Sequence, residues 1–62
     1  MTYADAVKLK PGDHVKPKKL KDTDYVGTVL RLDINSPIVT NQYCYVYLTD
    51  GGRYYHKDLI KI

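Results

Sequence analysis

One stretch of the chain, YCYVYL at residues 43–48, decides the fold. Its residues alternate strictly, so Cys44, Val46 and Leu48 fall on one side of an extended chain and three tyrosines fall on the other. This period of two predicts a central β-strand with an apolar face toward a core and a tyrosine face on its reverse. The predicted fold of the whole chain depends on this strand.

The residues that follow predict a hairpin and a last strand. Asp50-Gly51-Gly52 supplies the positive φ angles of a tight turn, which returns the chain into a strand over residues 53–56. Lys57-Asp58 predicts a short turn, and residues 59–62 (LIKI), apolar apart from Lys61, predict a final strand.

The residues before the central stretch predict another strand and a loop. Residues 25–32 (YVGTVLRL) are rich in β-branched and apolar side chains, and Gly27 among them indicates either a close approach of the backbone to a neighbour or a bulge where the sheet bends. Residues 33–41 contain Asn, Ser and Pro and predict a loop. Three apolar residues of this loop could extend the strands on either side of it: Ile34, Ile38 and Val39.

The N-terminal third predicts less regular structure. Residues 14–16 predict a short strand, which Pro17 either ends or restricts to a sheet edge. Residues 18–24 predict a polar, basic loop. A Thr-x-x-Asp motif at residues 2–5 resembles a capping box and predicts one helical turn over residues 3–7.

Five short strands in 62 residues predict an all-β fold, a five-stranded small barrel of residues 12–62 preceded by a helical turn or extension over residues 1–11. The composition agrees, because all seven aromatic residues are Tyr and all seven acidic residues are Asp, with no Glu to favour helix. The predicted core is Val15, Val29, Leu32, Cys44, Val46, Leu48, Leu59 and Ile62, together with Val26 or Leu30.

Four motifs in this order resemble the Tudor-like and KOW-like members of the SH3-like small barrels. They are Gly-Asp-x-Val at residues 12–15, Tyr-Val-Gly-Thr-Val at 25–29, Thr-Asp-Gly at 49–51 and His-x-Asp-Leu at 56–59. The resemblance implies an SH3-like barrel. Similar barrels bind methylated lysine or arginine, nucleic acid, proline-rich peptides or a neighbouring domain.

Composition narrows the class of function. The single Cys44 fits a reducing cytoplasm, and no stretch approaches the roughly 20 apolar residues of a membrane span. His14 and His56 lack a carboxylate at ligand spacing, so we expect no metal and no cofactor. No pair of carboxylates, nucleophile with a base, or Gly-rich phosphate loop is found in the sequence, so we expect a cytoplasmic binding module rather than an enzyme, with no small-molecule substrate and no membrane partner.

Charge and aromatic residues indicate the binding surface. Residues 8–21 carry six Lys against one Asp, although the whole chain has a net charge of only +3. Tyrosine offers a wide ring and a hydroxyl at small entropic cost. The predicted ligand-binding residues are Tyr25, Tyr45, Tyr47, Tyr54, Tyr55, Lys16, Lys18, Lys19 and Arg53.

We expect a protein or peptide partner for this surface, with the chain itself a monomer or a weak homodimer. Two alternatives stay open at this point. The basic loop over residues 16–21 with stacking tyrosines could bind nucleic acid, or the chain could be a structural subunit of a larger assembly.

Overall fold

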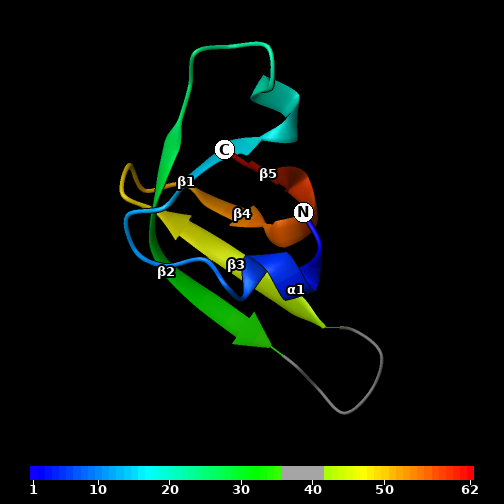
Figure 1. Ribbon diagram of the computed structural model, residues 1–62. Coiled ribbons are helices and arrows are strands. Elements are labelled where there is room, and N and C mark those ends of the chain that lie inside the picture. Colours follow the sequence, from blue (N-terminus) through cyan, green and yellow to red (C-terminus); the bar gives the residue numbers. More distant parts are fainter. Residues whose placement is uncertain (36–41) are drawn as a thin grey trace.

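Five antiparallel strands and one short N-terminal helix make up the described part of the chain, and the fold is mainly β (Figure 1). The structure is a computed structural model, and it describes residues 1–35 and 42–62. The elements are α1 (Tyr3–Ala6), β1 (His14–Pro17), η1 (Lys18–Leu20), β2 (Gly27–Asn35), β3 (Tyr43–Leu48), β4 (Arg53–Tyr55), η2 (His56–Asp58) and β5 (Leu59–Lys61), where η1 and η2 are turns of 3₁₀ helix.

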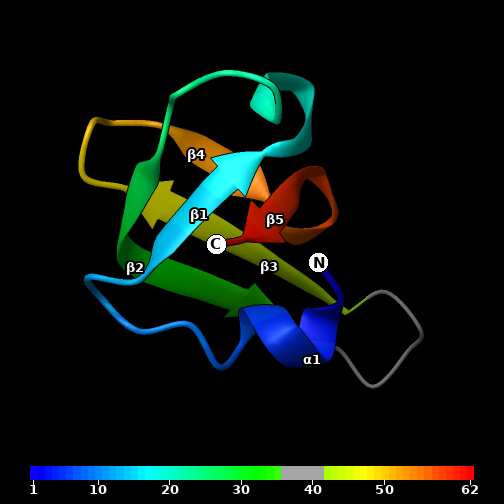
Figure 2. The ribbon, with the colours of Figure 1, turned by 45° about the horizontal axis from the view of Figure 1, so that its top comes forward.

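The strands form one sheet in the order β4-β3-β2-β1-β5, and all neighbours are antiparallel. The sheet curls, so that β1 and β5 lie in front of β3 and β4 (Figure 2). Pro17 ends β1, as predicted, because it has no N–H to donate to a neighbour. The alternative that it restricts the strand to an edge is wrong, since β1 lies between β2 and β5.

The central strand β3 has the predicted alternation. Its inward residues are buried and its tyrosines are half-buried along the whole of Tyr43–Leu48. The hairpin that follows is also as predicted, with Gly51 at φ +92° and the Asp50 Oδ1 accepting a hydrogen bond from the Gly52 N–H at 2.9 Å. Only an achiral residue adopts such a φ at no steric cost, which explains the glycine.

Strand β2 differs from its predicted bounds. It begins at Gly27 and runs to Asn35, so the predicted strand was placed about two residues early. Ile34 belongs to β2 and lies opposite Cys44, while Ile38 and Val39 lie outside the described residues. The irregularity in register falls between Val29 and Arg31 instead of at Gly27.

Gly27 instead marks a close approach of the backbone, the other reason predicted for its being glycine. A Cβ at this position would lie 2.6 Å from the Leu48 Cδ1, closer than real Cβ contacts come. The main chain of β2 therefore approaches the side chain of Leu48 at a point where any larger residue would collide with it.

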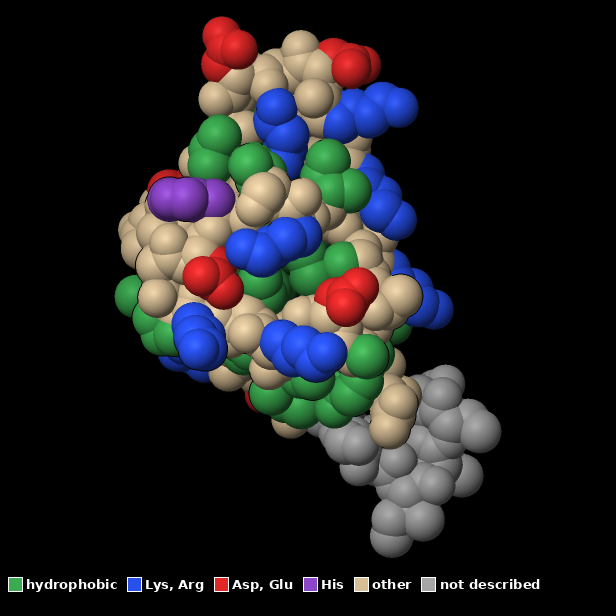
Figure 3. Space-filling model, viewed as in Figure 1, with side chains coloured by type: hydrophobic (Ala, Val, Ile, Leu, Met, Phe, Trp, Pro, Cys, Tyr) green, Lys and Arg blue, Asp and Glu red, His purple; other side chains and the backbone are tan. Residues whose placement is uncertain are grey.

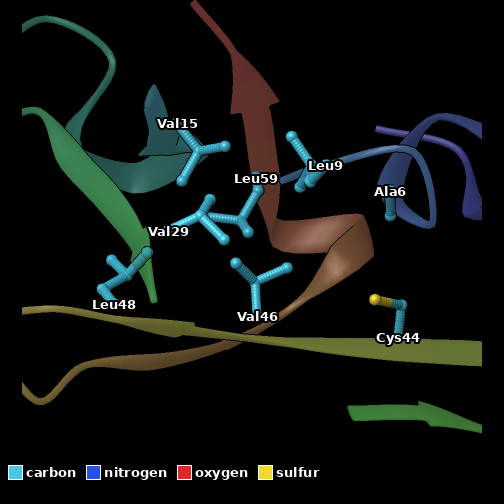
Figure 4. Close-up of a cluster of buried hydrophobic side chains, with 8 residues drawn as sticks. All are labelled: Ala6, Leu9, Val15, Val29, Cys44, Val46, Leu48 and Leu59. Carbon is cyan, nitrogen blue, oxygen red and sulfur yellow. The ribbon is translucent and has the colours of Figure 1, made fainter. Parts of the chain in front are cut away.

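The core lies in the curl of the sheet and is one cluster of apolar side chains (Figure 4). Those from β1, β2, β3 and β5 point toward one another, and α1 with the segment after it closes one end. The buried apolar residues are Ala6, Leu9, Val15, Val29, Cys44, Val46, Leu48 and Leu59.

Three residues that were predicted to lie in the core are exposed, and a fourth is only partly buried. Ile62 is 59% exposed, Leu30 52% and Val26 49%, while Leu32 packs against the core from its margin. Val26 precedes β2 and Ile62 follows β5, each three positions from a buried residue and therefore on the opposite side of an extended chain. Leu30 directly follows the buried Val29 at the irregularity in register, where its side chain faces solvent.

The N-terminal segment packs onto the sheet, a point that the sequence left open. The Thr2 hydroxyl accepts a hydrogen bond from the Asp5 N–H at 3.2 Å, so α1 has the predicted cap. Ala6 and Leu9 are buried, and the Met1 amino group donates to the His56 carbonyl at 3.1 Å. None of the helices in residues 1–35 and 42–62 has the length and apolar character needed to cross a membrane.

Candidate functional site

The outer side of β3 carries a cluster of tyrosine rings. Tyr45 lies opposite Tyr55 of β4, with ring centroids 5.7 Å apart. Tyr43 contacts both rings, at 5.2 Å from Tyr45 and 6.4 Å from Tyr55. The rings are inclined to one another by 46–71°, which is the edge-to-face and tilted packing that aromatic pairs prefer.

Cationic side chains lie over this cluster from the neighbouring strands. The Arg31 Cζ lies 3.8 Å from the ring centroid of Tyr47, and the Arg53 Cζ lies 4.8 Å from that of Tyr45. Lys57 lies more loosely over Tyr55, at 6.0 Å. We call this surface the tyrosine face, and it consists of Tyr43, Tyr45, Tyr47, Tyr55, Arg31 and Arg53.

The remaining predicted tyrosines lie elsewhere. Tyr54 lies opposite Val46 in the register, so it faces the other way from Tyr55 and packs against the core. Tyr25 also packs against the core, and its hydroxyl donates a hydrogen bond to the Asp50 carboxylate. Lys19 lies over the Tyr54 ring at 5.8 Å, so these residues form a second surface, separate from the tyrosine face.

A shallow pocket accompanies this second surface. It has a volume of about 130 Å³, less than the roughly 300 Å³ at which small-molecule sites begin. The pocket is lined by Pro17, Lys19, Tyr54 and Asp58. A wider hollow of about 380 Å³ is lined by Met1, Asp5, Lys8 and Lys61, none of which is a predicted site residue.

The hydrogen bond between Tyr25 and Asp50 perturbs both groups. This hydrogen bond, because the neutral phenol donates to a carboxylate, and to a lesser degree burial raise the pKa of Tyr25 to about 12. The same bond is the main reason that the pKa of Asp50 is lowered. The two residues therefore hold the hairpin turn against the segment before β2.

Replacing Asp50 with asparagine is expected to lower the pKa of Tyr25 toward the ordinary value of 10.0. The physical reason is that the amide carries no charge with which the phenolate would be repelled. The Cζ chemical shift of Tyr25 followed against pH measures it. Asp58→Asn, on the pocket side, serves as the control and should leave the titration unchanged; an equal midpoint in wild type and Asp50→Asn would contradict the assignment.

The lysines of the predicted basic loop point to different places. The Lys16 Nζ donates to the carbonyls of Lys21 and Thr23, so it stabilises the loop internally. Lys18 lies near the Met1 amino group and contributes to lowering its pKa, after burial. In the face that Figure 3 shows, basic side chains are spaced over the surface with acidic ones among them.

His56 and Cys44 form a buried pair. The Cys44 N–H donates to the His56 Nδ1 at 3.1 Å, so the neutral ring carries its proton on Nε2. His56 is 2% exposed, and burial followed by the charge of Lys57 lowers its pKa. Burial raises the pKa of the Cys44 thiol. Within the described residues, no group of three or more His, Cys, Asp or Glu side chains could hold a metal ion.

The structure thus divides the predicted site residues. It brings Tyr45, Tyr47, Tyr55 and Arg53 together on the tyrosine face and places Tyr25, Tyr54 and Lys19 on the second surface, while Lys16 and Lys18 belong to neither. The predicted binding residues lacked two members of the tyrosine face, Tyr43 and Arg31, and also Lys57 beside it. The alternation of Arg31 with Leu32 was a signal for an outward side chain, but its neighbour across the sheet was not predictable.

Comparison of the chain with protein-family models, with curated proteins and with solved structures finds no match. We therefore infer function from the geometry of the described residues.

Proposed function

We propose that this chain is a small non-catalytic binding module that engages a protein or peptide partner through the tyrosine face. The observation that carries the proposal is the position of the tyrosine cluster on the side of β3 opposite the core. The buried residues of β3 are Cys44, Val46 and Leu48, so packing of the interior does not account for the tyrosines. Tyrosine and arginine are the residues that most often dominate the energetics of protein interfaces.

We further propose that the curled sheet is an SH3-like small barrel. The support is the strand order, a meander from β1 to β4 after which β5 returns to pair with β1. The 3₁₀ turn η2 between β4 and β5 and the register shift in β2 add to it, because small barrels need local bends to close. The four motifs that resemble Tudor-like and KOW-like barrels are consistent with this fold.

Nucleic acid is the less favoured partner. Stacking of bases requires open ring faces, and on the tyrosine face arginine side chains lie over Tyr45 and Tyr47. The nucleic-acid alternative also relied on the lysines of residues 16–21 lying beside those rings. Lys16 is instead bonded to the carbonyls of its own loop, and Lys19 lies over Tyr54 on the second surface.

Selection of peptides from a random display library against the folded protein tests the proposal. The selected peptides should perturb the amide resonances of β3 and β4. Tyr45→Ser combined with Tyr55→Ser should weaken their binding by about tenfold or more, as truncation of interface hot spots does.

Tyr54→Ser is the control, because it removes the neighbour of Tyr55 in β4, whose ring lies on the other side of the sheet. This variant should bind the selected peptides nearly as well as wild type. Circular dichroism must show that each variant is folded. Absence of any selected peptide would contradict the proposal. So would binding that Tyr54→Ser abolishes and the tyrosine-face variant leaves intact, which would move the ligand to the second surface.

A further inference from the structure

Arginines flank Tyr47 on both sides across the sheet. Arg31 of β2 lies opposite Tyr47 of β3, which lies opposite Arg53 of β4. Neighbouring strands are about 4.8 Å apart, so the Cα atoms of the two arginines are separated by roughly 10 Å. Long side chains that start at this separation on the same side of a sheet can reach the same ligand.

Tyrosines position both guanidinium groups. The contact at 3.8 Å places Arg31 on the ring of Tyr47, and Arg53 lies over Tyr45 at 4.8 Å. A hydrogen bond with the Tyr47 side chain is the first cause that raises the pKa of Arg53. A guanidinium held on a ring keeps N–H donors at its edge, and less side-chain entropy is lost when those donors bind a ligand.

Cations dominate the charge of this surface. Arg31, Arg53 and Lys57 all contact its tyrosine rings. Asp33 of β2 lies opposite Tyr45 on the same side of the sheet, and its charge contributes to raising the pKa of Arg53. The fork of a guanidinium matches the two oxygens of a carboxylate, and hydrogen bonds between such groups are among the strongest in proteins. With three cationic side chains against one carboxylate among these residues, the surface offers a ligand mainly donors and positive charge.

Resting on the proposed function, we propose that the partner is an acidic peptide segment and that its carboxylates dock on Arg31 and Arg53 at either side of Tyr47. In an extended peptide, side chains two residues apart point the same way and are separated by about 6.6–6.8 Å. Alternate acidic residues would therefore face the two arginines together. Part of the affinity is electrostatic and should fall as salt is added.

Titration with a short peptide of alternating Glu and Ser, blocked at both ends, tests this inference. The peptide should shift the side-chain Nε–Hε resonances of Arg31 and Arg53 and the amides of β3. The same peptide with Gln in place of Glu should bind at least about tenfold more weakly, because charge-assisted hydrogen bonds are lost. An oligothymidylate is the probe for a nucleic-acid ligand.

Arg31→Gln combined with Arg53→Gln should weaken binding of the Glu peptide by about tenfold or more, since both charged donors are removed. Lys18→Gln combined with Lys19→Gln removes the same charge away from the tyrosine face and should change affinity less than about twofold. Arg53→Lys keeps the positive charge and loses the planar fork of the guanidinium. Its affinity for the Glu peptide should lie between those of the double arginine variant and the double lysine variant.

Three results would overturn the inference. The first is equal affinity for the Glu and Gln peptides, and the second is an equal loss of affinity in the double arginine variant and the double lysine variant. The third is tighter binding of the oligothymidylate than of the Glu peptide at the same two arginines. Library peptides that depend on Tyr45 and Tyr55 but not on the two arginines would overturn it as well, and would leave the proposed function standing. Failure of every peptide to bind the tyrosine face would refute both.

Discussion

Replacing Leu48 with alanine is expected to destabilise the protein by about 2–5 kcal/mol, the usual cost of truncating a buried leucine. Leu48 is 1% exposed and belongs to the cluster of buried apolar side chains that forms the core. A domain of 62 residues is expected to have a total stability of only about 3–9 kcal/mol, at roughly 0.05–0.15 kcal/mol per residue. Unfolding in urea, followed by circular dichroism, measures the change.

The contact between Leu48 and Gly27 makes this expectation more specific. Gly27→Ala alone should cost about 1–3 kcal/mol, because its Cβ would collide with the Leu48 Cδ1 and force strain on a packed core. In the Leu48→Ala background that atom is absent. The double variant should therefore be more stable than the sum of the single effects implies, by about 0.5–3 kcal/mol.

Gly12→Ala is the matched control for the double variant. Gly12 has φ +95°, and a Cβ added there would meet nothing within 4 Å, so its substitution costs conformational energy without a collision. Its effect should add to that of Leu48→Ala without coupling. Simple additivity for Gly27→Ala as well would show that the close approach of β2 to Leu48 is not the reason for the glycine.

The free energy of unfolding is expected to fall as the pH drops below about 6.5, because of His56. The folded state holds this ring neutral, with Nδ1 accepting from the Cys44 N–H, and its pKa is lowered below the ordinary value of 6.5. The unfolded chain takes up the proton first. The stabilisation that comes from the neutral ring is thus fully present above the pKa of His56 in the unfolded chain. It is lost as the pH falls toward the lower pKa of the folded state, with a slope of up to about 1.4 kcal/mol per pH unit.

Urea unfolding between about pH 7 and pH 5 measures this slope, above the range in which aspartates titrate. His56→Gln keeps a side-chain acceptor for the Cys44 N–H and has no titrating ring. The variant should be less stable than wild type at neutral pH. Its stability should also depend less on pH in this interval, because the titrating group is gone. His14→Gln, at an exposed position of β1, is the control that removes a histidine outside the core. An unchanged slope in His56→Gln would refute the role of the buried ring.

Much of the fold was predictable because it depends on neighbours in the sequence. The alternation of residues 43–48 predicts both sides of β3, and the Asp-Gly-Gly turn predicts the hairpin after it. Pro17 predicts the end of β1, and the Thr-x-x-Asp motif predicts the cap of α1. Each of these features follows from a side-chain period or from the backbone preference of one or two residues.

The composition of the candidate site was less predictable, because it depends on which strand lies beside which and in what register. Alternation along β4 already puts Tyr54 and Tyr55 on opposite sides, but only the pairing with β3 decides that Tyr55 is the one beside Tyr45. The register shift after Val29 likewise brings Arg31 to Tyr47. The Lys16 side chain donates its hydrogen bonds to carbonyls of residues 21 and 23, and these carbonyls come within reach only after the turn of η1.

The amino-acid order was thus sufficient for the strands, the turns and the tyrosine side of β3, since local geometry sets them. The partition of the tyrosines and cations into two surfaces, the burial of His56 and the packing of Ala6 and Leu9 arise from contacts between distant parts of the chain. Those contacts exist only when the sheet has curled around its core. A period of two records which way a side chain points and contains no information about what it meets there.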